Sequence, residues 1–348
     1  MKITASLNNI CILFFLITFV SRAQTNALTM KEKFREKIKQ KIEKKLADAP
    51  SPSTLPDLKI NQINKPGDYT LSLKQDDIER FYKIHVPKNY KSENPTPLVL
   101  AFHGGLGDME IQSTEKYYHQ ISKSESEGYI ALFPNGYSKF KSGKLATWNA
   151  ETCCGEARDK KINDIEFIKK IIEKTKSELN IDSHKIFATG ISNGGMISYR
   201  IACELADIFK AIAAVASTDN VIDCNPKNPI SILHIHANND DHILFNGGMG
   251  PKAINKAAET EFISVPKTIA KWVRINECPK IPKRILNIEG AYCDLYSPCK
   301  NHTEVKLCVT EKGGHSWPGG EKPRSNSGES PSSVISATDL IWDFFKEK

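Results

Sequence analysis

Short apolar runs, half of them ending at glycine, alternate along the chain with segments whose apolar residues recur every three or four positions. The runs are continuous rather than alternating, as expected of strands buried on both faces of a parallel sheet. They lie at 97–105, 129–136, 184–190, 211–217, 229–237 and 304–310. Segment 78–87 instead alternates apolar and polar residues, which predicts an early antiparallel strand.

The periodic segments between these runs predict helices. Asn163 and Glu166 fit a capping box at the start of one helix, whose apolar face consists of Ile165, Ile168, Ile171 and Ile172. A second helix, 194–206, begins directly after the run 184–190, and the amphipathic segment 333–348 closes the chain. Alternating strands and helices predict an α/β fold, a mostly parallel central sheet flanked by helices, over residues 66–348.

The N-terminal segments follow other patterns. Apolar residues 10–20, preceded by Lys2 and followed by Ser21-Arg22-Ala23, predict a signal peptide over residues 1–23. This run is too short to cross a bilayer as a helix, so we expect an exported, soluble protein. Residues 24–65 contain a predicted helix, 30–46, followed by a linker rich in proline and serine.

The formal charge of +7 is concentrated in the predicted helix 30–46, which holds eight Lys/Arg against three Glu. Every fourth residue of this segment is apolar, giving a thin apolar stripe: Met30, Phe34, Ile38, Ile42 and Leu46. One interpretation is weak contact with an anionic surface, and the other is a solvated helix packed loosely on the domain. The rest of the chain is close to neutral, so no nucleic-acid partner is expected.

Cysteine usage agrees with export. Of the nine cysteines, Cys11 lies in the signal segment, and the remaining eight are an even number at positions 153, 154, 203, 224, 278, 293, 299 and 308. This predicts disulfides, whose connectivity the sequence leaves open. The adjacent Cys153 and Cys154 are expected to bond to two different partners. No C-x-x-C pair with histidine partners is present, so no metal site is predicted.

Candidate chemistry begins at Ser192, in Gly190-Ile191-Ser192-Asn193-Gly194, which fits the G-x-S-x-G turn between a strand and a helix. A serine hydroxyl becomes a nucleophile when an imidazole accepts its proton and a carboxylate orients that imidazole. In the α/β-hydrolase order the acid and then the histidine follow the serine. His315, in the glycine-rich loop 311–320, is therefore the candidate base.

Two carboxylates qualify as the orienting acid. Asp240 and Asp241 both follow the predicted strand 229–237, and Asp240 is favoured because it lies four residues beyond His236 at the end of the strand. The tetrahedral intermediate also needs backbone N–H donors. We expect these at Asn193 and at Gly105, in the glycine-rich loop 103–107 at the end of an early strand.

These segments together resemble the exported polyhydroxybutyrate depolymerase and feruloyl esterase family of α/β-hydrolases. The resemblance rests on PLVLAFHGG, TWNAETCCGEA, IFATGISNGGM, HIHANNDD and GGHSWPGG, in the order that the family has them. It implies Ser192 as nucleophile, Asp240 as acid and His315 as base, with oxyanion donors at Gly105 and Asn193. Ala237 and Asp241 depart from the glycine and proline that are common in the family, which leaves the choice between the two aspartates open.

Substrate contacts are also predicted. The resemblance implies that Trp317 lies at the mouth of the cleft and holds part of the substrate, while the alternative is that it closes the histidine loop against the core. His103 and Gly104 are expected beside the substrate in the oxyanion loop.

The pattern as a whole predicts a secreted serine esterase that works through an acyl-enzyme without a cofactor. Its substrates would be short 3-hydroxyalkanoate oligomers or feruloyl or acetyl esters. Two alternatives are a serine peptidase on the same fold and a non-catalytic relative that binds a surface through the basic helix.

Overall fold

The computed structural model describes residues 32–52, 63, 65–253, 262–323 and 328–348. The chain divides into two compact units, residues 1–50 and 51–348. The predicted signal peptide, 1–23, lies outside the described residues. In the first unit, residues 32–47 are helical, where the sequence predicts a helix over 30–46, and its apolar side chains Phe34, Ile38 and Ile42 are exposed. Among the described residues no helix has the length and apolar character needed to cross a membrane.

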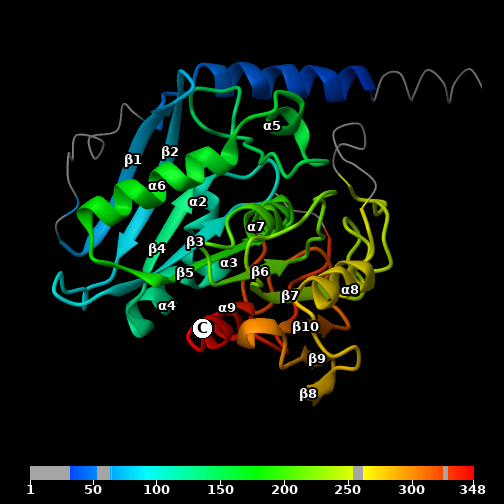
Figure 1. The fold of residues 1–348 in the computed structure, drawn as a ribbon. Coiled ribbons are helices and arrows are strands. Elements are labelled where there is room, and N and C mark those ends of the chain that lie inside the picture. The colour runs from blue at the N-terminus through cyan, green and yellow to red at the C-terminus, as the bar shows by residue number, and fades with distance from the viewer. Residues whose placement is uncertain (1–31, 53–62, 64, 254–261, 324–327) are drawn as a thin grey trace, which may run out of the picture. The chain divides into compact units, whose positions relative to one another are not determined.

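The second unit is built on one sheet, in which the described residues form ten strands ordered β1-β2-β4-β3-β5-β6-β7-β10-β9-β8 (Figure 1). The six strands from β4 to β10 in that order are parallel neighbours, and an antiparallel pair extends each edge. This confirms the predicted α/β class. The strands are β1 (Gly67–Gln75), β2 (Ile78–Val86), β3 (Thr96–Phe102), β4 (Ile130–Pro134), β5 (Ile181–Ile191), β6 (Ala211–Val215), β7 (Ser231–Ala237), β8 (Lys283–Ile288), β9 (Ala291–Tyr296) and β10 (Val305–Thr310).

The helices of this unit cover both faces of the sheet. They are α2 (Met109–Gln112), α3 (Glu115–Tyr118), α4 (Gln120–Glu127), α5 (Gly155–Asp159), α6 (Asp164–Glu178), α7 (Asn193–Glu204), α8 (Val265–Ile275) and α9 (Ala337–Phe345), with a short 3₁₀ turn at Lys300–His302. Asn163 caps α6 by accepting from the N–H of Glu166, as the capping box predicts. Ser336 caps α9 in the same way, so the last helix begins later than its apolar pattern suggests.

Successive residues of the central strands face opposite cores, because side chains alternate across a strand. Leu98, Leu100 and Phe102 of β3 pack into the core that contains α6, α7 and α8. Val99 and Ala101 of the same strand face the core that contains α9. The sheet is therefore buried on both faces, which explains the continuous apolar runs in the sequence.

Four disulfides join the eight cysteines that follow the signal segment: Cys153–Cys154, Cys203–Cys224, Cys278–Cys299 and Cys293–Cys308. The expectation that Cys153 and Cys154 bond to different partners is wrong. The other six cysteines pair among themselves across the antiparallel edge and around α7 and α8, which leaves the two adjacent thiols to each other. Both lie in a small apolar cluster with Met196, Ile243 and Phe262.

We predict that replacing Cys203 and Cys224 by alanine lowers the free energy of unfolding by about 2–4 kcal/mol, because the bridge restricts a loop of the unfolded chain. Their separation in sequence is 21 residues. The matched control is the double alanine variant of Cys153 and Cys154, whose separation of one residue closes almost no loop, so its loss should be smaller. Urea unfolding of both variants measures the difference, and equal losses would contradict the prediction.

Candidate active site

The candidate nucleophile, Ser192, forms the sharp turn between β5 and α7. Its backbone has φ 57° and ψ −124°, a strained conformation for a residue with a side chain. A Cβ at Gly190 or Gly194 would overlap backbone atoms of Gly194 or Phe102, so both positions require glycine. The turn is held by Ser217, whose hydroxyl donates to the Ser192 carbonyl over 2.9 Å. These contacts give the G-x-S-x-G pattern its physical reason.

The loops that carry the three candidate catalytic residues all leave the sheet at the carboxyl ends of its parallel strands. β5, β6, β7 and β10 are neighbouring parallel strands, with Ile191 paired to Val215, Val215 to Ile235, and Ala237 to Thr310. The carboxyl ends of these strands therefore lie next to one another, and this is where α/β proteins have their active and ligand-binding sites. Ser192, Asp240 and His315 follow β5, β7 and β10 respectively.

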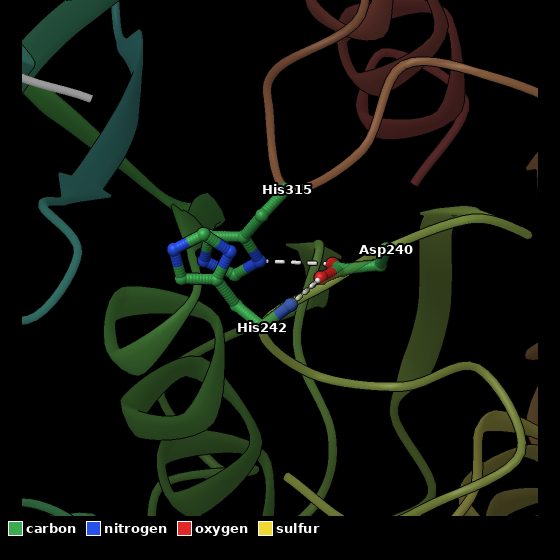
Figure 2. A group of neighbouring side chains, drawn as sticks. All are labelled: Asp240, His242 and His315. Atoms are coloured by element: carbon green, nitrogen blue, oxygen red, sulfur yellow. Dashed lines mark hydrogen bonds and ion pairs between the residues drawn. The ribbon is translucent and has the colours of Figure 1, made fainter. Parts of the chain in front are cut away.

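The Asp240 carboxylate accepts a hydrogen bond from His315, with 2.8 Å between Oδ2 and Nδ1 (Figure 2). Its other oxygen accepts from the backbone N–H groups of His242 and Ile243, at 2.8 and 2.9 Å. Asp240 is buried, whereas Asp241 is partly exposed and pairs with Lys252 and with the His242 ring. Of the two aspartates that the sequence left open, Asp240 contacts the candidate base.

The electrostatics of this pair favour a charged acid and a basic imidazole. Burial by itself raises the pKa of Asp240, but the charge of His315 and hydrogen bonds from His236 and His315 outweigh it and lower the pKa well below its ordinary value. Burial lowers the pKa of His315, and the attraction of Asp240 more than compensates, so the pKa is raised. Because a carboxylate only accepts, Nδ1 of His315 carries the proton and Nε2 is free to act as a base.

Two further histidines lie beside this pair. The buried His236 places Nε2 3.3 Å from Oδ2 of Asp240 and 3.0 Å from the Ile243 carbonyl. His242 stacks on His315, with 4.7 Å between ring centroids and 19° between ring planes. Neither histidine was predicted from the sequence to belong to the site. One potential metal-ligand atom from each of Asp240, His242 and His315 lies within 4.8 Å of the others.

The predicted oxyanion loop lies directly against the nucleophile turn. A Cβ on Gly104 would come within 3.4 Å of the Ser192 Cβ, and one on Gly105 within 3.6 Å of the Asn193 Cβ. Glycine at 104 and 105 therefore leaves room beside Ser192 that a side chain would fill. The two predicted oxyanion donors, Gly105 and Asn193, belong to segments in contact.

Trp148 joins these two segments. The Asn193 side chain accepts from the Trp148 backbone N–H at 2.7 Å and donates to the Trp148 carbonyl at 3.0 Å. The indole Nε1 of Trp148 donates to the His103 carbonyl at 3.0 Å. The side chain is fully buried. No role for Trp148 could be predicted from the sequence, because the residues that it bridges are 45 positions away along the chain.

His103 and Trp317 are both buried. His103 is fully buried; its Nδ1 donates to the Gly104 carbonyl and its Nε2 accepts from the Gly136 N–H. Burial lowers the pKa of His103 to about 4, so the ring is neutral. Trp317 is 2% exposed, donates to the Thr338 hydroxyl and packs edge-on against Tyr118. These contacts hold both side chains in the scaffold beneath the loops, and the substrate contacts expected of His103, Gly104 and Trp317 stay predictions.

Comparisons with known proteins agree with this architecture. The family model of the prolyl oligopeptidase family matches residues 115–225, a stretch that contains Ser192. Feruloyl esterase B of Piromyces equi is 27% identical over 238 residues, which cover 67% of this chain and 42% of that protein. A protein of Aspergillus niger named "Probable feruloyl esterase C" is 32% identical over 175 residues, covering 49% of this chain and 58% of that protein. The chain thus spans about half the length of these relatives.

A solved structure, the acetyl xylan esterase from Aspergillus awamori, superposes with a TM-score of 0.54 at 15% identity, covering 80% of this chain and 99% of that one. This likeness concerns the fold. The sheet order, the strained serine between β5 and α7 and the superposition agree that the chain has the α/β-hydrolase fold, and its sequence is similar to those of feruloyl esterases.

Proposed function

We propose that this protein is a serine esterase that hydrolyses carboxylic esters with a Ser192–His315–Asp240 triad. The observation that carries the proposal is the hydrogen bond between Asp240 and His315, at the sheet edge where Ser192 occupies its strained turn. The triad's roles follow from chemistry: the acid fixes the tautomer of the imidazole, which activates the hydroxyl. No cofactor takes part in this reaction.

In the first half of the reaction, Nε2 of His315 accepts the Ser192 proton as Oγ attacks the ester carbonyl carbon. The oxyanion accepts hydrogen bonds from the backbone N–H groups of Gly105 and Asn193. The intermediate collapses, the bond to the alcohol oxygen breaks, and His315 gives its proton to that oxygen. Water then attacks the acyl-enzyme with His315 as base, which releases the carboxylic acid and restores Ser192.

The substrate class rests on the relatives. Two of them are named feruloyl esterases, which favours feruloyl esters, and acetyl esters of polysaccharide and 3-hydroxyalkanoate oligomers stay within the proposal. A serine peptidase is the second candidate, because the prolyl oligopeptidase family model matches the segment around Ser192. Esters and peptides use the same triad, so only turnover separates the two.

Export completes the proposal. The signal segment 1–23 and the four disulfides fit an oxidising compartment, and N-terminal sequencing of the mature protein tests cleavage after Ala23. We also propose that residues 30–46 contact anionic surfaces weakly. If they do, deletion of residues 24–56 should abolish binding of the protein to anionic vesicles.

We predict that Ser192→Ala lowers kcat for ester hydrolysis by roughly 10⁴-fold or more while leaving the fold intact, because the nucleophile is lost. The assay would compare p-nitrophenyl butyrate, methyl ferulate, acetylated xylan, 3-hydroxybutyrate oligomers and a peptide p-nitroanilide. Ser177→Ala, at an exposed position of α6, is the matched control and should retain full activity. Cleavage of the peptide alone would favour the peptidase, and ester hydrolysis that survives Ser192→Ala would refute the triad.

We expect Asp240→Asn to reduce kcat by about 10³–10⁴-fold, because the amide no longer holds His315 in the tautomer that accepts the serine proton. Asp241→Asn should change kcat by less than about tenfold, since Asp241 pairs with Lys252 and His242 instead. Steady-state kinetics measure kcat for both isosteric variants. A larger loss of kcat for Asp241→Asn than for Asp240→Asn would assign the acid to Asp241.

We predict that Trp148→Phe lowers kcat by about tenfold or more with little change in KM. The variant keeps an aromatic side chain but loses the indole N–H that donates to the His103 carbonyl, so the Gly105 donor is less well positioned in the transition state. Trp342→Phe is the matched control, because the buried Trp342 indole N–H has no partner among the described residues. If both variants lose the same activity, the effect of Trp148 is one of packing alone.

A further inference from the structure

We propose that Nε2 of His242 and Nε2 of His315 form a binding site for a divalent transition-metal ion such as Zn²⁺. An ion held there occupies the lone pair of the candidate base and stops hydrolysis. The inhibitory half of this proposal rests on the proposed esterase function, whereas the binding half does not.

The two imidazoles are arranged side by side. Their rings stack with 4.7 Å between centroids, and Figure 2 shows both Nε2 atoms on the same side, away from Asp240. The side chains are 17% and 13% exposed for His242 and His315, so solvent reaches the pair. Among the described residues, neither Nε2 atom has a hydrogen-bond partner.

Each ring also has the carboxylate partner that is typical of metal-binding histidines. Nδ1 of His315 donates to Asp240 at 2.8 Å, and Nδ1 of His242 donates to Asp241 at 2.7 Å. Such pairs fix the tautomer with its lone pair on Nε2 and raise the basicity of that nitrogen toward a metal. The sequence supplies this second pair through three consecutive residues, Asp240, Asp241 and His242.

The carboxylates themselves are held in place. Asp240 accepts two backbone N–H groups, and Asp241 forms an ion pair with Lys252 at 2.7 Å. Asp240 and Asp241 lie beside two lysines, Lys252 and Lys322, so the surroundings carry no large negative charge. Imidazole lone pairs rather than charge would therefore hold the ion. This selects zinc, copper or nickel over calcium and magnesium, which prefer oxygen ligands.

Binding requires a small movement. Zinc–nitrogen bonds of 2.0–2.1 Å at a tetrahedral angle place two ligand nitrogens about 3.3 Å apart. Stacked rings direct their lone pairs side by side, so the rings must tilt toward each other to share one ion, and the partly exposed His242 lies in the loop after β7. Water fills the remaining positions of the ion. His315 then lacks a free Nε2 to accept the Ser192 proton, and inhibition is reversed when a chelator removes the metal.

The test uses the mature protein without a polyhistidine tag and ZnCl₂ as the probe. Isothermal titration calorimetry should give one Zn²⁺ per chain for the unaltered protein, at least about tenfold weaker binding for His242→Gln, and unchanged binding for Ser192→Ala. His184→Gln, an exposed histidine at the start of β5, is the matched control and should bind like the unaltered protein. Circular dichroism checks that each variant is folded.

Ester hydrolysis is then measured with and without Zn²⁺. We expect inhibition of the unaltered protein and of His184→Gln, reversed by EDTA, and about tenfold higher Zn²⁺ for the same inhibition of His242→Gln. Equal zinc affinity of His242→Gln and the unaltered protein, or no binding to the folded unaltered protein, would overturn the site. If zinc binds through His242 but the metal-free protein hydrolyses no ester, the metal site stands and the proposed function fails.

Discussion

The turn at Ser192 depends on backbone segments that approach one another more closely than side chains allow. Gly194 lies against the carbonyl of Phe102 at the end of β3, and Gly190 lies against the first turn of α7. A methyl group at either position would push α7 away from the sheet. The serine can then occupy its positive-φ conformation, because parallel strands on both sides and the Ser217 hydroxyl hold the turn.

The same close packing makes the candidate oxyanion site a product of three segments. The loop after β3 brings Gly105, the start of α7 brings Asn193, and Trp148 fixes both by hydrogen bonds to Asn193 and to the His103 carbonyl. Segment 148–149 is itself anchored: the Asn149 N–H donates to Asp164, which forms a fully buried ion pair with Arg80. Removal of either partner would leave an uncompensated buried charge, which is strongly destabilising.

On the other side of Ser192, the charged side chains of Asp240 and Asp241 hold the loop after β7 in place. Asp240 is buried among N–H donors, and Asp241, one residue later, faces solvent beside Lys252. Adjacent residues thus orient two different imidazoles, one that the proposed mechanism uses and one that stacks against it. The candidate base His315 therefore has a second imidazole, that of His242, beside it, and the proposed metal site consists of these two rings.

The sequence by itself determined the features that depend on local pattern and chain order. Continuous apolar runs gave the parallel strands, the capping box at Asn163 gave the start of α6, and the order of Ser192, Asp240 and His315 identified the candidate triad. The edge hairpin of β8 and β9 escaped prediction, because most residues of β8 are exposed and its side chains follow no burial pattern. Local pattern carries this information because helix and strand periods are properties of neighbouring residues.

Only the tertiary structure decided which distant residues meet. It paired Cys153 with Cys154 by pairing the other cysteines with each other, and it placed Asp240 rather than Asp241 on His315, 75 positions away. It also buried His103 and Trp317 beneath the loops. The physical reason is that the order of the strands in the sheet brings loops from distant parts of the chain together, and the periodicity of neighbouring residues does not specify that order.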